Sequence, residues 1–334
     1  MTHPEELPLG LVADIGGTNV RFALAEAADG TITEPRSYRT ASFATLTDAV
    51  AHYLDEVRTA RRPRLGVFAV AGIVRGDEIG ITNGEWRFSP SDLERTLGFE
   101  RFHAVNDFAA LGWALPSLQD RDVVPFGWEG RRPDTHTGSF ALLGPGTGLG
   151  VSAVYARPDG LLVQATEGGH VAFAPGTPEE VDVLRWLQER FGRVSYERLL
   201  SGQGLSNLYS ALSALHGARV DELSPEQVTA RAADGGDPLA RHAVRMFSGL
   251  LGAFAGDAVL MLGAWDGVYL AGGLVTALFD LLDREVFRAR FEDKGRFAST
   301  LAQVPTVAIV QPNVGLLGAA AVLRSRYRAG RAGS

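Results

Sequence analysis

The sequence predicts an α/β protein, and three observations support this class. Short apolar runs of strand length alternate with longer segments whose apolar residues recur at helical spacing. Two of the apolar runs are followed by a turn rich in Gly and Thr and then by a second strand-like run, about 130 residues apart. The chain has 334 residues, which suggests two domains, and 46% of them are hydrophobic and 21% charged, as is ordinary for a globular protein.

The first half of the chain begins with a strand and a tight turn. Leu9–Asp14 is a short apolar run that ends at Gly16-Gly17, and it predicts a buried strand. The later predicted elements are the strands Val20–Glu26 and Thr31–Thr40, the helix Thr45–Arg61, the strand Leu65–Ala71, a helix from Ser91, the strand Phe102–Val105 and the helix Phe108–Leu115. Ser91 is assigned as a helix start because Glu94 follows three residues later, the pattern of a capping box.

The second half begins with Gly127–Gly138, whose Gly, Arg, Pro and Thr residues predict a surface loop. The later predicted elements are the strands Phe140–Leu143 and Val151–Ala156, the largely helical stretch Pro178–Gly263, the strand Val268–Ala271, a helix from Leu274, the strand Val304–Val310 and the helix Gly315–Arg328. The most apolar stretch, Gly249–Phe279, is interrupted by Asp257 and Asp266. It therefore predicts a buried helix and a core strand rather than a membrane span.

The composition excludes several classes of function. The net charge is −7, and Lys294 is the single lysine beside 31 arginines. An acidic chain without a basic run does not predict a nucleic-acid partner or binding to an anionic membrane. The absence of cysteine excludes disulfides, thiolate zinc sites, iron–sulfur clusters and a cysteine nucleophile. Met1–Gly10 contains two Glu and no Lys or Arg, so we expect no secretion signal and a cytoplasmic location.

Two turns rich in Gly and Thr are candidates for phosphate binding. Asp14-Ile-Gly-Gly-Thr18 and Gly144-Pro-Gly-Thr-Gly148 both follow a strand, and glycine lets backbone N–H groups approach an anion. Neither turn matches G-x-x-x-x-G-K-[ST] or G-x-G-x-x-G, so a plain hairpin remains the alternative. The Asp14 carboxylate could hold Mg²⁺, directly or through water, or it could cap the turn. Arg21 on the next strand could pair with Asp14 or contact phosphate.

Three further groups of residues lie at strand ends or beside flexible backbone. Asn106-Asp107 lies where a buried strand meets a helix; an Asp there can accept a hydroxyl proton, although position alone favours a helix N-cap. Glu167-Gly-Gly-His170 and Glu197 supply the mixed acceptors and donors that a polyol needs, while a lone His is more often structural. Gly272-Gly273 follows a strand, where a flat base could lie against backbone or a bare turn could suffice.

Taken in order, these motifs resemble the bacterial glucokinase family, a branch of the actin-like sugar-kinase superfamily. The resemblance covers about residues 9 to 325 with order and spacing intact. It rests on Ala-Asp14-Ile-Gly-Gly-Thr-Asn-Val-Arg21, Asn106-Asp107-Phe-Ala-Ala, Gly144-Pro-Gly-Thr-Gly-Leu-Gly150, Glu167-Gly-Gly-His-Val-Ala-Phe-Ala-Pro175, Glu197-Arg-Leu-Leu-Ser-Gly202, Leu270-Ala-Gly-Gly273 and Gly315-Leu-Leu-Gly-Ala319. The Glu-Gly-Gly-His and Asn-Asp blocks in this order are the most specific part.

The resemblance implies a fold and a reaction. The fold would be two actin-like (ribonuclease H-like) α/β domains flanking a cleft, a small one of residues 1–117 plus 312–334 and a large one of residues 118–311. The reaction would be ATP-dependent phosphorylation of glucose at O6, with Mg²⁺, in a homodimer. Asp107 would be the catalytic base, and the sugar would be bound by Asn106, Asp107, Glu167, His170 and Glu197. ATP would be bound by Ala13, Asp14, Ile15, Gly16, Gly17, Thr18, Gly146, Thr147, Gly148, Gly272 and Gly273, and Mg²⁺ by Asp14.

Two departures and two alternatives accompany the resemblance. The family usually has Pro where Ile73 stands and often has Pro where Gln203 stands. A sister branch positions its His through a Cys-rich zinc motif, which a chain without cysteine cannot do. One alternative is a kinase for another hexose, or one that uses polyphosphate as donor. The other is a non-catalytic sugar-binding sensor, against which the intact Asp107 and both phosphate turns argue.

Overall fold

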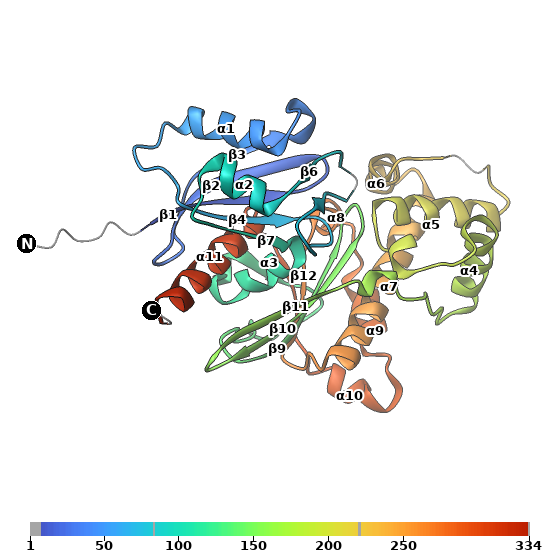
Figure 1. Ribbon diagram of the computed structural model, residues 1–334. Coiled ribbons are helices and arrows are strands. Elements are labelled where there is room, and N and C mark those ends of the chain that lie inside the picture. Colours follow the sequence, from blue (N-terminus) through green and yellow to red (C-terminus); the bar gives the residue numbers. More distant parts are fainter. Residues whose placement is uncertain (1–7, 83, 220–221, 333–334) are drawn as a thin grey trace, which may run out of the picture. The chain divides into compact units, whose positions relative to one another are not determined.

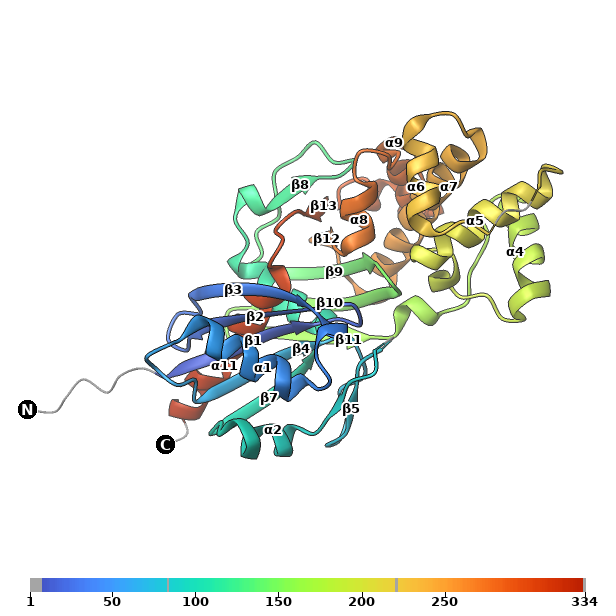
Figure 2. The ribbon, with the colours of Figure 1, turned by 90° about the horizontal axis from the view of Figure 1, so that it is seen from above.

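The chain folds as two α/β units in the computed structural model, which describes residues 8–82, 84–219 and 222–332 (Figures 1 and 2). The first unit contains the described residues up to Leu118 and those from Gln311 onward, and the second unit is Gln119–Val310. The chain therefore leaves the first unit once and returns to it, so that blue and red segments lie together in Figure 1.

The first unit is built on a five-stranded sheet in the order β3-β2-β1-β4-β7. The strands β3, β2 and β1 are antiparallel, whereas β1, β4 and β7 are parallel. Its elements are β1 (Leu9–Ile15), β2 (Asn19–Glu26), β3 (Ile32–Arg39), α1 (Leu46–Val57), β4 (Leu65–Val70), β5 (Ile79–Gly80), β6 (Arg87–Phe88), α2 (Pro90–Leu97), β7 (Arg101–Asn106), α3 (Asp107–Ala114) and α11 (Val314–Ala332), with 3-10 helices at Thr40–Ser42 and Leu115–Ser117.

The two faces of this sheet are covered by different helices because side chains alternate along each strand. Phe22 and Phe68 lie on one face with α1, and their fully buried rings meet edge to face with centroids 6.2 Å apart. Val12 and Val67 lie on the other face and pack against α11. The C-terminal helix is therefore part of the core of the N-terminal unit.

The second unit is built on a six-stranded sheet in the order β11-β10-β9-β12-β13-β8. Its strands are β8 (Val123–Pro125), β9 (Gly138–Pro145), β10 (Leu149–Arg157), β11 (Gly160–Thr166), β12 (Gly267–Leu270) and β13 (Thr306–Ile309). Its helices are α4 (Pro178–Phe191), α5 (Gly202–Leu215), α6 (Pro225–Asp234), α7 (Pro238–Leu262), α8 (Gly273–Leu278), α9 (Arg284–Glu292) and α10 (Ala298–Leu301), with 3-10 helices at Asp120–Asp122, Gly168–His170, Tyr196–Arg198 and Gly295–Phe297.

The two sheets share one strand pattern. In each, three antiparallel strands (β3-β2-β1 and β11-β10-β9) are followed by two parallel ones (β4-β7 and β12-β13). The two Gly/Thr turns occupy equivalent positions, between β1 and β2 and between β9 and β10. The predicted α/β class, with two actin-like halves that each carry such a hairpin, is confirmed.

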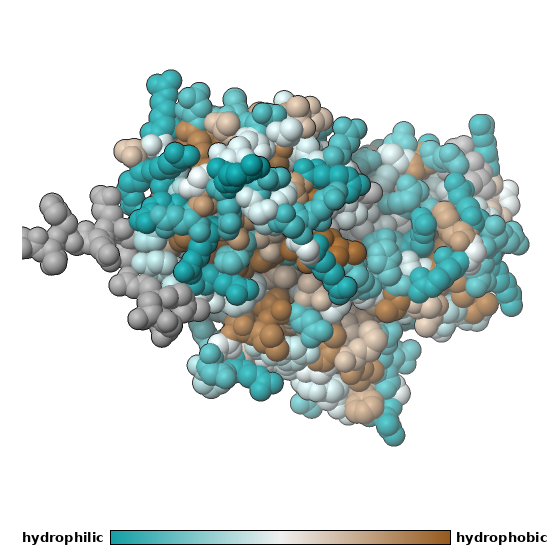
Figure 3. Space-filling view, in the orientation of Figure 1, coloured by the Kyte–Doolittle hydropathy of each residue, from teal (hydrophilic) through white to brown (hydrophobic). Residues whose placement is uncertain are grey.

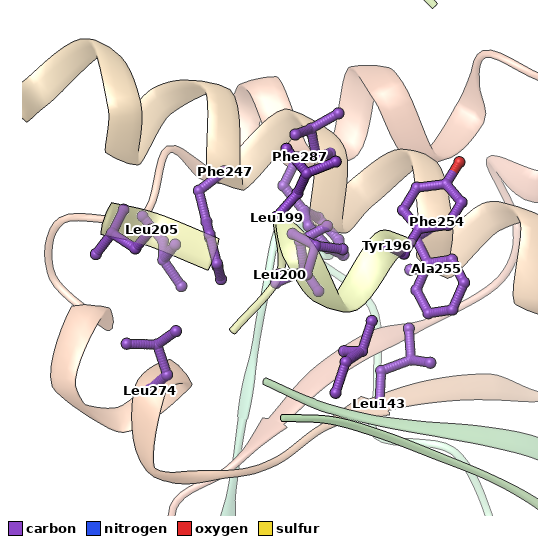
Figure 4. Packing of buried hydrophobic residues seen from close by; sticks show 14 of the residues in the cluster. Leu143, Tyr196, Leu199, Leu200, Leu205, Phe247, Phe254, Ala255, Leu274 and Phe287 are labelled. Atoms are coloured by element: carbon purple, nitrogen blue, oxygen red, sulfur yellow. The ribbon is translucent and has the colours of Figure 1, made fainter. Parts of the chain in front are cut away.

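The helix α7 forms the centre of the second unit. It is long and apolar enough to cross a membrane, but 72% of its most apolar window is buried inside the protein. Its Phe247 and Phe254 face Leu199, Leu200 and Tyr196, as Figure 4 shows. The expected buried helix is thus a core helix of this unit.

Several local predictions are wrong or incomplete. Ser89, not Ser91, caps α2: its hydroxyl accepts from Asp92 N, because Pro90 fixes the first helical turn two residues earlier than predicted. Ser91 instead donates to Asp77. The surface of the first unit that Figure 3 shows over α2 is mainly hydrophilic. The helix predicted as Thr45–Arg61 already ends at Val57, because Arg58 takes a left-handed conformation. The strands β5, β6, β8 and β11 and the helix α9 were not predicted.

Candidate active site

The first Gly/Thr turn joins β1 to β2 and is held closed by backbone hydrogen bonds. Gly16 N donates to Asn19 O at 2.9 Å, and the Thr40 hydroxyl donates to Gly17 O at 2.7 Å. The side chain of Thr18 is exposed at the tip. The predicted tight turn is therefore confirmed, and its outer surface is available for a ligand.

A pocket of about 520 Å³ opens beside this turn, within the first unit. Its floor includes the largely buried indole of Trp86, whose Nε1 donates to Phe43 O. The described residues that line it are Gly16, Gly17, Thr40, Ala41, Ser42, Phe43, Ala44, Ile81, Gly84, Glu85 and Trp86. Gly16 and Gly17 thus adjoin open space, as a phosphate-binding turn requires.

Asp14, the sixth residue of β1, is paired with Arg21 across the β1–β2 ladder. Arg21 Nη1 lies 3.0 Å from Asp14 Oδ2. Burial raises the pKa of the Asp14 carboxyl above its ordinary value, and the Arg21 guanidinium opposes that rise. A second cation near Asp14 would favour its charged form further.

The first turn of α11 lies against Asp14. A Cβ built on Gly315 would be 2.6 Å from both Cγ and Oδ2 of the Asp14 carboxylate. Only glycine therefore lets the start of this helix approach so closely. The positive end of a helix also favours a nearby anion, so α11 helps to hold the carboxylate.

Asn106 and Asp107 were each predicted either to cap the following helix or to contact a ligand, and the structure shows which of them is the cap. Asn106 is the N-cap of α3: its Oδ1 accepts from Ala109 N at 3.1 Å, and its Nδ2 donates to Gly72 O at 3.1 Å. Asp107 is the first helical residue, and its Oδ1 accepts from Phe108 N at 2.9 Å. The capping role therefore belongs to Asn106, and the half-buried Asp107 carboxylate lies at the end of β7, directly after the cap.

The second Gly/Thr turn, in the second unit, is tied to Glu197. Gly146 N donates to Gly148 O at 2.8 Å, which closes the turn. Leu149 N donates to Glu197 Oε2 at 2.9 Å, and Gly202 N donates to Gly146 O at 2.8 Å. The exposed Thr147 lies at the tip.

The residues Glu167, His170 and Glu197 come together although 30 positions separate the first from the last. His170 Nδ1 lies 3.7 Å from Glu197 Oε1, and His170 Nε2 lies 4.0 Å from Glu167 Oε2. All three side chains are partly exposed to solvent. Two carboxylates and an imidazole thus form an acceptor-rich cluster, and sugar hydroxyls can donate hydrogen bonds to it.

Gly272 and Gly273 lie beside the second turn. Gly272 has a φ of 96°, and a Cβ on it would be 2.7 Å from Pro145 O. Two features therefore exclude a side chain at Gly272: its positive φ, and the close approach of Pro145 O at the end of β9.

The predicted site residues thus fall into one set in each unit. The first unit holds residues 13–18, Asn106 and Asp107, and the second holds the remainder. Ala13 and Ile15 have fully buried side chains, so only their backbone atoms could meet a ligand. One contact of this cluster was not predicted: Arg193 Nη2 donates to His170 O at 2.7 Å. No sequence pattern marks a guanidinium that bonds a backbone carbonyl.

Comparison with known proteins identifies the family. The glucokinase family model matches residues 11–326. A glucokinase of Stenotrophomonas maltophilia (strain R551-3) is 49% identical over 318 residues, 93% of each chain, and one of Xanthomonas campestris pv. campestris (strain B100) is 47% identical over 335 residues, 98% of each chain. A solved glucokinase structure from an Antarctic psychrotroph has a TM-score of 0.85 and 33% identity, and covers 96% of this chain and 100% of its own. With the motifs in place along both hairpins, the chain belongs to the glucokinase family.

Proposed function

We propose that this enzyme transfers the γ-phosphoryl group of ATP to O6 of glucose, with Asp107 as the general base. The observation that supports this role best is that Asn106, and not Asp107, is the N-cap of α3. Because Asn106 caps the helix, the Asp107 carboxylate is not required for that purpose. It can accept the hydroxyl proton as O6 attacks.

The sugar is bound, in this proposal, by Asn106, Asp107, Glu167, His170 and Glu197. The cluster around His170 offers four carboxylate oxygens and one imidazole, which suit vicinal hydroxyls. Charged acceptors bind hydroxyl donors more strongly than neutral acceptors do, which suits a polyol substrate.

ATP is bound, in this proposal, by the backbone of the two turns. With one lysine in the chain, phosphate charge must be met by amide N–H groups, hydroxyls, arginine and a metal ion. The proposed residues are Ala13, Asp14, Ile15, Gly16, Gly17, Thr18, Gly146, Thr147, Gly148, Gly272 and Gly273. Phosphoryl transfer depends mainly on such positioning and electrostatic stabilisation.

We propose Mg²⁺ as the metal ion of this reaction. Within the described residues no group of three or more His, Cys, Asp or Glu side chains is placed to hold a metal ion by itself. Mg²⁺ commonly uses one or two carboxylates together with substrate phosphates, and Asp14 supplies one carboxylate beside the first turn. When bound, the ion would neutralise phosphate charge. We expect activity to be lost with EDTA and restored by Mg²⁺ alone; stoichiometric zinc in the active protein would contradict this.

A coupled kinase assay over a hexose panel, with ATP and polyphosphate as alternative donors, tests the proposal. We expect glucose with ATP to give the highest kcat/KM. A preference for another hexose or for polyphosphate would replace the substrate or the donor, and sugar binding without turnover would indicate a sensor. We further propose a cytoplasmic homodimer, on the family resemblance; light scattering at several protein concentrations tests the dimer.

A further inference from the structure

The side chain of Glu197 contacts both the second Gly/Thr turn and the other residues of the proposed sugar-binding cluster. Glu197 Oε2 accepts from Leu149 N, the residue that directly follows the turn, at 2.9 Å. The other oxygen, Oε1, faces His170 at 3.7 Å. The carboxylate thus spans the distance between backbone that would meet phosphate and an imidazole that would meet sugar.

The backbone of the segment that contains Glu197 is held in place by hydrogen bonds and packing, so it cannot easily shift when the carboxylate moves. Leu199 N and Leu200 N both donate to Tyr196 O, and Tyr196 N donates to Val171 O, directly after His170. The Tyr196 ring is buried against Phe254, with centroids 4.5 Å apart (Figure 4). Its hydroxyl, whose pKa is raised to about 12 chiefly by burial, remains protonated and donates to Asp257.

Of the two glycines that flank Thr147, only Gly148 lies close to the Glu197 carboxylate. A Cβ built on Gly148 would lie 2.6 Å from Glu197 Oε2, whereas a Cβ on Gly146 meets nothing within 4 Å. Gly202 N, at the far end of the Glu197 segment, donates to Gly146 O at 2.8 Å. Two hydrogen bonds therefore link the backbone of the turn to the segment Glu197–Gly202, one to the Glu197 carboxylate and one to Gly202 N.

We propose that Glu197, beyond binding sugar, positions the Gly144–Gly150 turn and so couples the glucose and ATP sites. Sugar hydroxyls that fix the carboxylate also fix Leu149 N and the turn, and a turn held by phosphate fixes the carboxylate. Coupling of this kind is reciprocal, so it can be measured from either ligand. The inference rests on the proposed function, because it needs both ligands at these residues.

The first test changes only the turn and measures glucose binding by calorimetry without ATP. In Gly148→Ala the added Cβ must displace the Glu197 carboxylate, so we expect glucose affinity to fall at least about fivefold, the lower end of typical coupling. Gly146→Ala is the matched control, and its glucose affinity should stay within about twofold of the wild type. Equal glucose affinities in the two variants would overturn the inference.

The second test changes only the carboxylate and measures binding of a non-hydrolysable ATP analogue without glucose. Glu197→Gln and Glu167→Gln remove the same charge, and loss of a negative charge near a polyanion should by itself strengthen binding. Glu197→Gln also replaces a charge-assisted bond to Leu149 N, so we expect it to bind the analogue at least about fivefold more weakly than Glu167→Gln. Equal or tighter binding would overturn the inference, and this variant leaves the glycines unchanged should Gly148→Ala fail to fold.

The outcomes separate this inference from the proposed function. If the wild type does not bind glucose, or does not phosphorylate it with ATP, the proposed function fails. If it phosphorylates glucose while either paired comparison gives equal affinities, only the coupling fails.

Discussion

Replacing Asp107 by Asn isolates the chemical role proposed for this carboxylate. Asn has nearly the same size as Asp but cannot accept the O6 proton. Loss of a general base typically costs about 10²–10⁴-fold in rate, which corresponds to about 2.7–5.4 kcal/mol in the barrier at 1.36 kcal/mol per tenfold. We expect kcat of Asp107→Asn to fall by this factor at saturating glucose and ATP.

The effect on stability should be small, and the structure gives the reason. The cap of α3 is Asn106, which the substitution leaves in place. Asp107 accepts from Phe108 N, a bond that the Asn oxygen can also make, and its negative charge in the first helical turn is worth about 0.3–1 kcal/mol. The unfolding free energy in urea should therefore fall by about 1 kcal/mol or less.

Asn106→Ala is the matched control because it changes the cap and leaves the proposed base. It removes the acceptor for Ala109 N and the donor to Gly72 O, so we expect a loss of about 1–3 kcal/mol in unfolding free energy. The assays are urea unfolding, calorimetry with glucose and a coupled turnover assay on both variants. Turnover of Asp107→Asn within a few-fold of the wild type would refute the base assignment.

Three further outcomes are expected. In Gly315→Ala the new Cβ would lie 2.6 Å from the Asp14 carboxylate, so urea unfolding should show a loss of about 1–3 kcal/mol; an unchanged value would contradict the close approach. Arg193→Met removes the donor to the His170 carbonyl, so calorimetry should show glucose affinity reduced about fivefold, or about 1 kcal/mol, and no change would exclude a positioning role. Burial, with a smaller contribution from an arginine on α11, lowers the pKa of His103 below 6.5. The unfolded chain therefore binds a proton at this residue more readily than the folded one, and the unfolding free energy falls as the pH drops below about 6.5. Urea unfolding at pH 7.5 and 5.5 should show a smaller fall in unfolding free energy for His103→Gln than for the wild type.

Elements with strong local patterns could be predicted from the sequence, and those formed by pairing could not. Leu9–Asp14 is a continuous apolar run because β1 is covered on both faces, and the predicted and observed strands agree closely. The edge strand β11 has mostly exposed residues and adjacent apolar ones, Leu161 to Val163, so its pattern does not alternate. It forms because it pairs with β10, a contact that periodicity does not report.

The candidate site shows the same distinction. Glu167 and His170 share a short motif, and Glu197 could be grouped with them because their chemistry suits a polyol. The bond from Leu149 N to Glu197 joins a backbone atom to a side chain 48 residues away, and nothing in residue type or spacing indicates it. At the start of α3, residue type allowed either Asn106 or Asp107 to be the cap, and only the backbone geometry decides between them.

The packing of α11 against the first sheet has a consequence for how the chain folds during synthesis. Val12, Ala23 and Val67 are made early, but the helix that covers them begins at Val314. At about 5–20 residues per second, roughly 10–40 s separate Leu118 from Val314 on the ribosome. One apolar face of the nascent sheet stays uncovered for that time, while the continuous segment Gln119–Val310 can fold as it emerges. Synthesis of α11, rather than completion of the first 118 residues, therefore sets when the N-terminal unit can reach its final form.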